Sequence, residues 1–157
     1  VYPGTFDPMT LGHEDLMRRA AGLFDRLILG VAAGHHKRTL FSVDERLEIA
    51  REIAAPYKNV EIMRFGGLLR DFVVGEGAKV VVRGLRAVSD FDYELQMAQM
   101  NHRLTEVETL FVSTNPLYSY LSSSLVKEVA GHGGDVSGLV PDVVLTHLAA
   151  RLATRGD

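Results

Sequence analysis

The chain has 157 residues, a formal net charge of -3 and no cysteine, and 46% of its residues are hydrophobic. A chain of this length can bury one core, so we expect residues 1–157 to form a single domain. The lack of cysteine excludes disulfides and thiolate metal sites, the charge gives no general attraction for nucleic acid, and no apolar run is long enough to cross a bilayer. These exclusions favour a cytoplasmic protein that binds neither nucleic acid nor a membrane.

Short apolar runs alternate with helical patterns along the chain. The apolar runs are rich in Val, Ile, Leu and Phe with little alternation, which is typical of parallel strands buried on both faces. We expect strands at residues 1–2, 27–33, 60–65, 79–83 and 109–113. We expect helices at residues 14–24, 68–74, 93–104, 123–130 and 142–153. Ser42 and Glu45 form a predicted capping box, which indicates that a further helix begins there and runs through Ile53.

This alternation predicts a doubly wound, five-stranded parallel α/β sheet with right-handed crossovers. In such folds, ligands bind beyond the carboxyl ends of the strands. Four segments rich in polar residues and glycine follow predicted strands, at residues 2–13, 34–38, 83–86 and 113–124. We therefore expect these four segments to meet at one edge of the sheet and to form the functional site.

The first of these segments reads Y-P-G-T-F-D-P-M-T-L-G-H. Gly4 and Gly12 allow close approach of the backbone to a ligand or to a neighbouring element. His13 is expected at a helix N-terminus, where backbone N–H groups and the helix dipole favour an anion. The alternative is a turn in which Asp7 and Thr10 make local hydrogen bonds. The pattern is neither a dinucleotide fingerprint nor a P-loop.

Two later segments also suit phosphate groups. Arg83 and Arg86 flank Gly84, and the planar guanidinium fork binds phosphate oxygens in a bidentate manner. An isolated pair of this kind is equally explained by two solvated surface arginines. Three serines at residues 122–124 precede an apolar helical pattern, where they are N-cap candidates and offer hydroxyls and helix N–H groups to an anion.

Taken together, the segments resemble a known enzyme family. G-T-F-D-P-M-T-L-G-H is similar to the signature of phosphopantetheine adenylyltransferases, in which T-x-G-H replaces the H-x-G-H of the wider nucleotidylyltransferase superfamily. R-G-L-R-A-V-S-D-F-D-Y-E-L-Q-M-A-Q-M-N at residues 83–101 and S-S-S-L-V-K-E-V at residues 122–129 resemble two more motifs of that family. The resemblance covers essentially the whole chain and implies a Rossmann-like fold assembled as a homohexamer.

The resemblance implies transfer of the adenylyl group of ATP to 4'-phosphopantetheine, which gives dephospho-coenzyme A and pyrophosphate in coenzyme A biosynthesis. Mg²⁺ is implied as a companion of the triphosphate, and we find no all-protein metal cage in the sequence. Two alternatives remain. One is a related transferase with another acceptor, such as nicotinamide mononucleotide or glycerol 3-phosphate. The other is a non-catalytic nucleotide-binding module, which should have lost one of His13, Lys37, Arg83 or Arg86.

The resemblance also implies roles for individual residues. It implies catalytic roles for His13, Lys37 and Arg86. It implies contacts with the acceptor from Thr5, Lys37, Leu69 and Arg83. It implies contacts with ATP from Thr5, Phe6, His13, Gly84, Leu85, Arg86, Glu94, Tyr118, Ser119, Tyr120, Leu121, Ser122, Ser123 and Ser124.

Some of these residues have an ordinary structural explanation. Leu69 is equally a core leucine, and the position of Glu94 in the first turn of a predicted helix is explained by helix electrostatics. The helical spacing of Met97, Met100 and Leu104 is more typical of a core face than of a cofactor-binding face.

The segment around Lys37, G-H-H-K-R-T-L-F, departs from the N-P-x-K pattern that is commonest in the family. A lone lysine in a loop is usually just solvated, so the role of Lys37 rests on the resemblance. His35 and His36 are not expected to bind a metal, because adjacent side chains diverge and no carboxylate is close in the sequence.

The implied reaction fits these residue types. A phosphate monoester has a second pKa of about 6, so the acceptor is largely ionised near pH 7 and needs no general base. Catalysis then consists mainly of positioning and charge stabilisation. We expect His13 to donate to the α-phosphate, Arg86 and residues 122–124 to hold the β- and γ-phosphates, Lys37 and Arg83 to hold the acceptor phosphate, and Thr5 to bridge the substrates.

Overall fold

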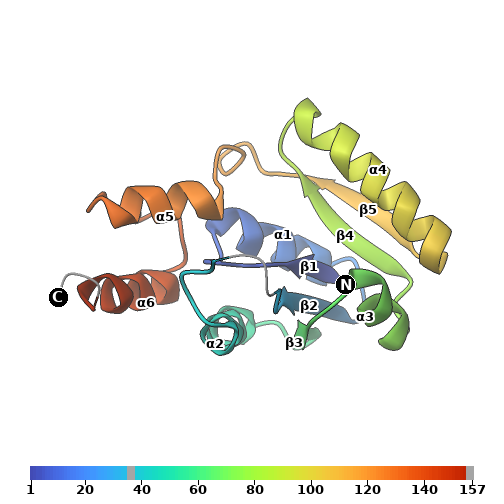
Figure 1. The fold of residues 1–157 in the computed structure, drawn as a ribbon, viewed down its shortest axis with the longest axis horizontal. Coiled ribbons are helices and arrows are strands. Elements are labelled where there is room, and N and C mark those ends of the chain that lie inside the picture. The colour runs from blue at the N-terminus through green and yellow to red at the C-terminus, as the bar shows by residue number, and fades with distance from the viewer. Residues whose placement is uncertain (35–37, 155–157) are drawn as a thin grey trace.

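The structure is a computed structural model that describes residues 1–34 and 38–154 (Figure 1). Lys37 and the histidine pair before it lie outside the described residues. The strands of the described part are β1 (Tyr2–Gly4), β2 (Leu27–Ala32), β3 (Val60–Phe65), β4 (Val80–Leu85) and β5 (Glu108–Ser113). Its helices are α1 (Leu11–Ala21), α2 (Val43–Ala54), α3 (Leu69–Gly75), α4 (Val88–Thr105), α5 (Ser123–Gly131) and α6 (Asp142–Ala153).

All strand pairs are parallel, and they form two sheets, β1-β2-β3 and β4-β5. The two sheets meet at Val1, whose nitrogen donates to the Val80 carbonyl at 2.8 Å and whose carbonyl accepts from the Val82 N–H at 2.8 Å. The strands therefore lie in the order β3-β2-β1-β4-β5. The predicted α/β architecture with parallel strands is confirmed, with the five strands divided between sheets of three and two.

The order of the strands places a topological switch point between β1 and β4. The chain runs outward from β1 through β2 to β3, and then returns to the other side of β1 to form β4 and β5. In open α/β sheets, ligands bind beyond the carboxyl ends of the strands at such a point.

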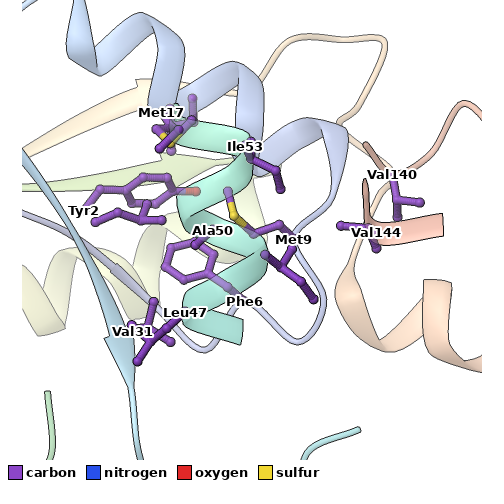
Figure 2. Close-up of a cluster of buried hydrophobic side chains, with 14 of the residues drawn as sticks. Tyr2, Phe6, Met9, Met17, Val31, Leu47, Ala50, Ile53, Val140 and Val144 are labelled. Atoms are coloured by element: carbon purple, nitrogen blue, oxygen red, sulfur yellow. The ribbon is translucent and has the colours of Figure 1, made fainter. Parts of the chain in front are cut away.

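The main core lies between β1, β2 and the helices α1 and α2 (Figure 2). Met17 from α1, Val31 from β2 and Ala50 from α2 are fully buried there. Tyr2 and Phe6 enter the same cluster from β1 and the loop after it. The loop that precedes α1 is therefore packed into the core on one side.

Helix α1 begins at Leu11, earlier than the predicted residue 14, because Thr10 caps it. The Thr10 hydroxyl accepts from the His13 N–H at 3.3 Å, and the Thr10 N–H donates to His13 Nδ1 at 2.9 Å. This capping box uses a histidine where glutamate or glutamine is usual, so the usual pattern did not reveal it. The box predicted at Ser42 and Glu45 opens α2 as expected.

Helix α4 begins at Val88, earlier than the predicted residue 93, and none of its residues is buried. Met97, Met100 and Leu104 are 39%, 59% and 47% exposed. The prediction that they belong to the core is therefore wrong for the single chain. Figure 1 shows α4 lying along β4 and β5, apart from the core helices α1 and α2. Helical spacing identifies an apolar face but not what covers it. No helix within residues 1–34 and 38–154 has the length and apolar character needed to span a bilayer.

Candidate active site

A cavity of about 400 Å³ opens at the carboxyl ends of β1 and β4, and the first turns of α1 and α5 border it. The switch point and two helix N-termini therefore coincide, which makes the cavity suitable for an anionic ligand. Its lining residues are Tyr2, Pro3, Gly4, Phe6, Thr10, Gly12, His13, Leu16, Arg83, Gly84, Arg86, Asp90, Glu94, Thr114, Tyr118, Leu121, Ser122 and Ser123.

The loop after β1 is shaped by Phe6, which has a positive φ of 51° and is only 4% exposed. Its ring lies over Gly4, where an added Cβ would come within 2.8 Å of the Phe6 Cζ atom. The same ring meets the His13 imidazole edge-on, with 5.2 Å between the ring centroids. Because Gly4 has no Cβ, the Phe6 ring can lie against its backbone, and from there it packs against the imidazole of His13.

The protonation state of His13 follows from its contacts. Burial, followed by the nearby Arg86 and Arg83, lowers the pKa of His13 to about 4, so the imidazole is neutral at pH 7. The Thr10 N–H donates to Nδ1, which must therefore be the unprotonated ring nitrogen. The proton of the neutral ring is then on Nε2. His13 can offer an Nε2–H donor to a ligand, whereas protonation of Nδ1 would break the capping box.

Arg83 is held firmly by Glu94. Its Nε and NH2 groups donate to the two carboxylate oxygens at 2.9 and 2.7 Å, and NH1 donates to the Pro3 carbonyl at 3.3 Å. This bidentate pair raises the pKa of Arg83 and connects β4 to α4. Its geometry fixes the guanidinium at the edge of the cavity, so Glu94 has a positioning role that the sequence did not indicate.

Arg86 is less tightly held than Arg83. Its NH1 donates to the Leu121 carbonyl at 3.0 Å, and its Nε lies 3.4 Å from the Asp90 carboxylate. The Arg86 side chain is 44% exposed, compared with 35% for Arg83. Arg86 therefore connects the end of β4 to the loop before α5 and keeps more of its surface available to a ligand.

The serines at the start of α5 have different roles. The Ser122 hydroxyl accepts from the Leu125 N–H at 3.1 Å and caps the helix. The Ser123 hydroxyl donates to the Pro8 carbonyl at 2.7 Å, which ties α5 to the loop after β1. Ser124 is exposed. The hydroxyls of Ser122 and Ser123 are therefore used in structural hydrogen bonds. An anion at the start of α5 can bind to the backbone N–H groups of its first turn.

A second, smaller cavity of about 100 Å³ adjoins the first. Arg83 and Glu94 line both cavities, so this ion pair forms the boundary between them. The remaining residues around the small cavity are Leu69, Tyr93, Met97, Ala98, Asn101 and Thr109. The geometry therefore offers two adjacent binding volumes on either side of one guanidinium.

The structure brings most of the predicted site residues together. The large cavity is lined by Phe6, His13, Arg83, Gly84, Arg86, Glu94, Tyr118, Leu121, Ser122 and Ser123. Leu69 lines the small cavity. The lining of neither cavity includes Thr5, Leu85, Ser119, Tyr120 or Ser124, and Lys37 lies outside the described residues.

The sequence reasoning missed several lining residues. Asp90 belongs to the first turn of α4, which the predicted helix start excluded. Thr114 lies in the segment 113–124 that was expected at the site, but it was not singled out as a contact residue. Leu16 lies one turn after His13 on α1, and an added Cβ at Gly84 would approach its Cδ2 atom to 3.2 Å. That packing contact holds α1 against β4 and is not visible in the sequence.

Comparison with known proteins agrees with this architecture. A family model described as "Cytidylyltransferase-like" matches residues 1–129. The chain is 58% identical to the phosphopantetheine adenylyltransferase of Frankia casuarinae, with 96% of each chain covered. It is 54% identical to the enzyme of that name from Streptomyces coelicolor, with 99% of this chain and 98% of the relative covered.

The chain belongs to the phosphopantetheine adenylyltransferase family. The resemblance seen in the motifs is thereby confirmed.

A solved structure shows the same fold at low identity. It is a bifunctional NMN adenylyltransferase/ADP ribose pyrophosphatase from Francisella tularensis, with a TM-score of 0.68 and 13% identity. The match covers 95% of this chain and 48% of that one. The likeness concerns the fold alone, so it does not favour nicotinamide mononucleotide as an acceptor.

Proposed function

We propose that this chain transfers the adenylyl group of ATP to 4'-phosphopantetheine, producing dephospho-coenzyme A and pyrophosphate in coenzyme A biosynthesis in the cytoplasm. The observation that carries the proposal is the identity of 54–58% to relatives named for this activity, over nearly the whole chain. The cavity between the N-termini of α1 and α5 supports it, because it suits a polyphosphate.

In the proposed reaction, an oxygen of the acceptor phosphate attacks the α-phosphorus of ATP. The bond from the α-phosphorus to the bridging oxygen of the β-phosphate breaks, and pyrophosphate leaves with that electron pair. The attacking group is already anionic near pH 7, since its second pKa is about 6. The protein therefore has to hold two anions in line and to stabilise the charge that develops.

We assign the α-phosphate to His13. Its neutral imidazole, with the proton on Nε2, can donate to the phosphate oxygen as charge accumulates. Loss of one such donor in enzymes that stabilise oxyanions costs about 2.7–4 kcal/mol. With a pKa of about 4, very little of the imidazolium form of His13 is present at pH 7 to act as a general acid, which is why the role assigned is hydrogen bonding.

We assign the β- and γ-phosphates to Arg86 and the first turn of α5. Arg86 lines the large cavity and retains exposed surface, and the Ser122 cap starts α5 on the same wall. Because Asp90 already offsets part of the charge of Arg86, backbone N–H groups of the helix are needed to complete the binding of a polyphosphate.

We assign the acceptor to the small cavity and the boundary beside it. Arg83 and Lys37 are proposed to hold its phosphate, Leu69 its pantetheine arm, and Thr5 to bridge the two substrates. The support is that Leu69 and Arg83 line one cavity while Arg83 also borders the larger one. Arg83 thus lies where an acceptor phosphate would have to approach the α-phosphate.

Mg²⁺ is proposed to enter with the triphosphate. Among residues 1–34 and 38–154 no three His, Cys, Asp or Glu side chains cluster as metal ligands, and the cavity carboxylates of Asp90 and Glu94 are paired with arginines. Such a site suits a cation that keeps water and phosphate oxygens as ligands. When bound, Mg²⁺ would neutralise charge on the β- and γ-phosphates.

We also propose a homo-oligomer, a hexamer by the family resemblance. The α4 apolar face, comprising Tyr93, Met97, Met100 and Leu104, is 39–64% exposed in the single chain. A contiguous apolar face of this kind marks an interaction surface. Because Tyr93 and Met97 also line the small cavity, a second copy on this face would lie next to the acceptor site.

The test measures pyrophosphate release from ATP with 4'-phosphopantetheine, nicotinamide mononucleotide or glycerol 3-phosphate as acceptor. We expect turnover with phosphopantetheine and at least about a hundredfold lower kcat/KM with the others, because buried polar groups discriminate strongly against the wrong substrate. Preference for another acceptor would favour the first alternative. ATP binding without release of pyrophosphate would favour the non-catalytic module.

A further inference from the structure

Asp7 is a buried carboxylate that none of the proposed steps uses. Its side chain is only 2% exposed, and its two oxygens accept from the N–H groups of Phe41 at 2.9 Å and Leu40 at 2.8 Å. The Lys127 ammonium on α5 also donates to it, at 2.9 Å. One carboxylate thus holds three segments together: its own loop after β1, the residues just before α2, and helix α5.

Arg46 is a second buried charge close to the first. It is 4% exposed, and its NH1 donates to the carbonyls of Thr5 at 2.7 Å and Ala32 at 2.8 Å. Its Nε donates to the Phe41 carbonyl at 3.3 Å. Phe41 is therefore held from both sides, by Asp7 at its N–H and by Arg46 at its carbonyl.

These contacts reach two parts of the active site, the loop after β1 and helix α5. Asp7 lies between Phe6, which supports His13, and Pro8, whose carbonyl accepts from Ser123 at the start of α5. Its bond to Lys127 adds a second tie to α5, one turn farther along the helix. Arg46 instead fixes the backbone of Thr5, the residue assigned to bridge the substrates.

Burial of two charges is costly, and a well-packed apolar cluster of the same volume is often at least as stable. The contacts made here are directional and join segments that are far apart in the sequence. In some proteins such contacts specify the relative positions of the segments they join, and a misplacement of about 1 Å can cost about a hundredfold in rate.

We propose that Asp7 and Arg46 are positioning residues that set the ATP side of the site against the acceptor side. Asp7 holds α5 through Lys127, and Arg46 holds Thr5, while Phe41 links the two charged side chains. The proposal rests on the roles assigned above to α5 and Thr5. It connects Asp7 to the ATP side through Lys127, and it connects Arg46 to Thr5, which is assigned to lie between the two substrates.

The experiment compares Asp7→Asn, Lys127→Met and Arg46→Lys in the full chain by kcat, by KM for each substrate and by thermal unfolding. Asp7→Asn keeps the shape but replaces one accepting oxygen with an NH2 group, which only donates, so we expect kcat to fall about tenfold or more. Lys127→Met should raise KM for ATP about threefold or more with little change for phosphopantetheine. Arg46→Lys should raise KM for both substrates, because Arg46 holds Thr5, which is assigned to bridge them.

Asp15→Asn is the matched control. Asp15 is also a buried carboxylate, 9% exposed, and it pairs with Arg18 and Arg19 on α1 without lining either cavity. Its replacement should lower the melting temperature but leave kcat and both KM values near wild type. If Asp7→Asn behaves like this control, the proposal is overturned.

The remaining outcomes also decide the matter. Equal effects of Lys127→Met and Arg46→Lys on both KM values would show a purely structural contribution and would overturn the proposal. Should Asp7→Asn fail to fold, Lys127→Met decides alone, because the Lys127 side chain is 30% exposed and its loss is tolerable. If the wild-type chain shows no turnover, the proposed function fails, and the effect of Lys127→Met on the calorimetric Kd for ATP still tests the connection of Asp7 to the ATP side.

Discussion

The two sides of the active site are built differently. The side formed by β1, β2, α1 and α2 is filled from within the chain: α2 alone buries Arg46, Leu47, Ile49, Ala50, Ile53 and Ala54. On the other side, α4 runs from Val88 to Thr105 and buries none of these residues. The chain therefore completes the packing of one wall by itself, whereas the outer face of the other wall remains uncovered.

The chemistry of the two walls differs in the same way. On the buried wall, polar groups such as Thr10 and His13 bond to each other and fix the loop after β1. On the α4 wall, Arg83 and Arg86 pair with carboxylates of α4 and extend into the cavity. The buried wall thus fixes the loop after β1 by packing and by bonds within the loop, whereas the α4 wall supplies most of the positive charge and holds it by ion pairs.

The strongest test compares the effect of one substitution on each wall on kcat and on KM for ATP. We expect His13→Ala to lower kcat about 10²–10³-fold and to leave KM for ATP comparatively unchanged, because the donor acts on charge that develops in the transition state. Arg86→Ala on the other wall should mainly raise KM for ATP. Steady-state kinetics of both variants measures this, and near-wild-type kcat for His13→Ala would contradict the mechanism.

We also expect substitutions in the two walls to differ in their effect on the free energy of unfolding. Leu47→Ala removes a side chain that is 6% exposed in the core and should lower the free energy of unfolding by about 2–5 kcal/mol. Met100→Ala removes one that is 59% exposed and should change it by less than about 0.5 kcal/mol in the dissociated chain. Denaturant unfolding at low protein concentration compares the two variants.

Met100→Glu extends the same comparison to assembly. A charge in the middle of the α4 apolar face should dissociate the proposed oligomer without unfolding the chain, which sedimentation velocity would detect. An unchanged oligomer would show that this face is not the interface.

A further test of the buried wall concerns pH. His13 has its pKa lowered to about 4 by burial, against an ordinary value of 6.5. Between these two values the unfolded chain binds a proton that the native state does not, so native stability falls as the pH drops from 6.5 to 4. Above pH 6.5 this contribution is constant. Unfolding free energies of wild type and His13→Gln across this range should show a shallower dependence in the variant, and parallel curves would argue against a buried neutral imidazole.

The fold class, the family and the approximate positions of the five strands could be predicted from the sequence, with the ends of β1 and β4 displaced by up to two residues. Parallel strands leave short apolar runs followed by polar segments rich in glycine, and these signals are local. For the same reason the start of α2 was correctly predicted, because its capping box uses Ser42 and Glu45, which lie close together in the sequence. The motifs also named most of the residues that line the large cavity, including His13, Arg83 and Arg86.

The way in which those residues act depends on the folded structure. The neutral state and tautomer of His13 depend on its burial and on the Thr10 N–H, and the restraint on Arg83 depends on Glu94 from another element. The exposure of α4 depends on what packs against it, which helical spacing cannot reveal. These properties arise from contacts between segments distant in the chain, and such contacts are set by the folded backbone and not by local residue patterns.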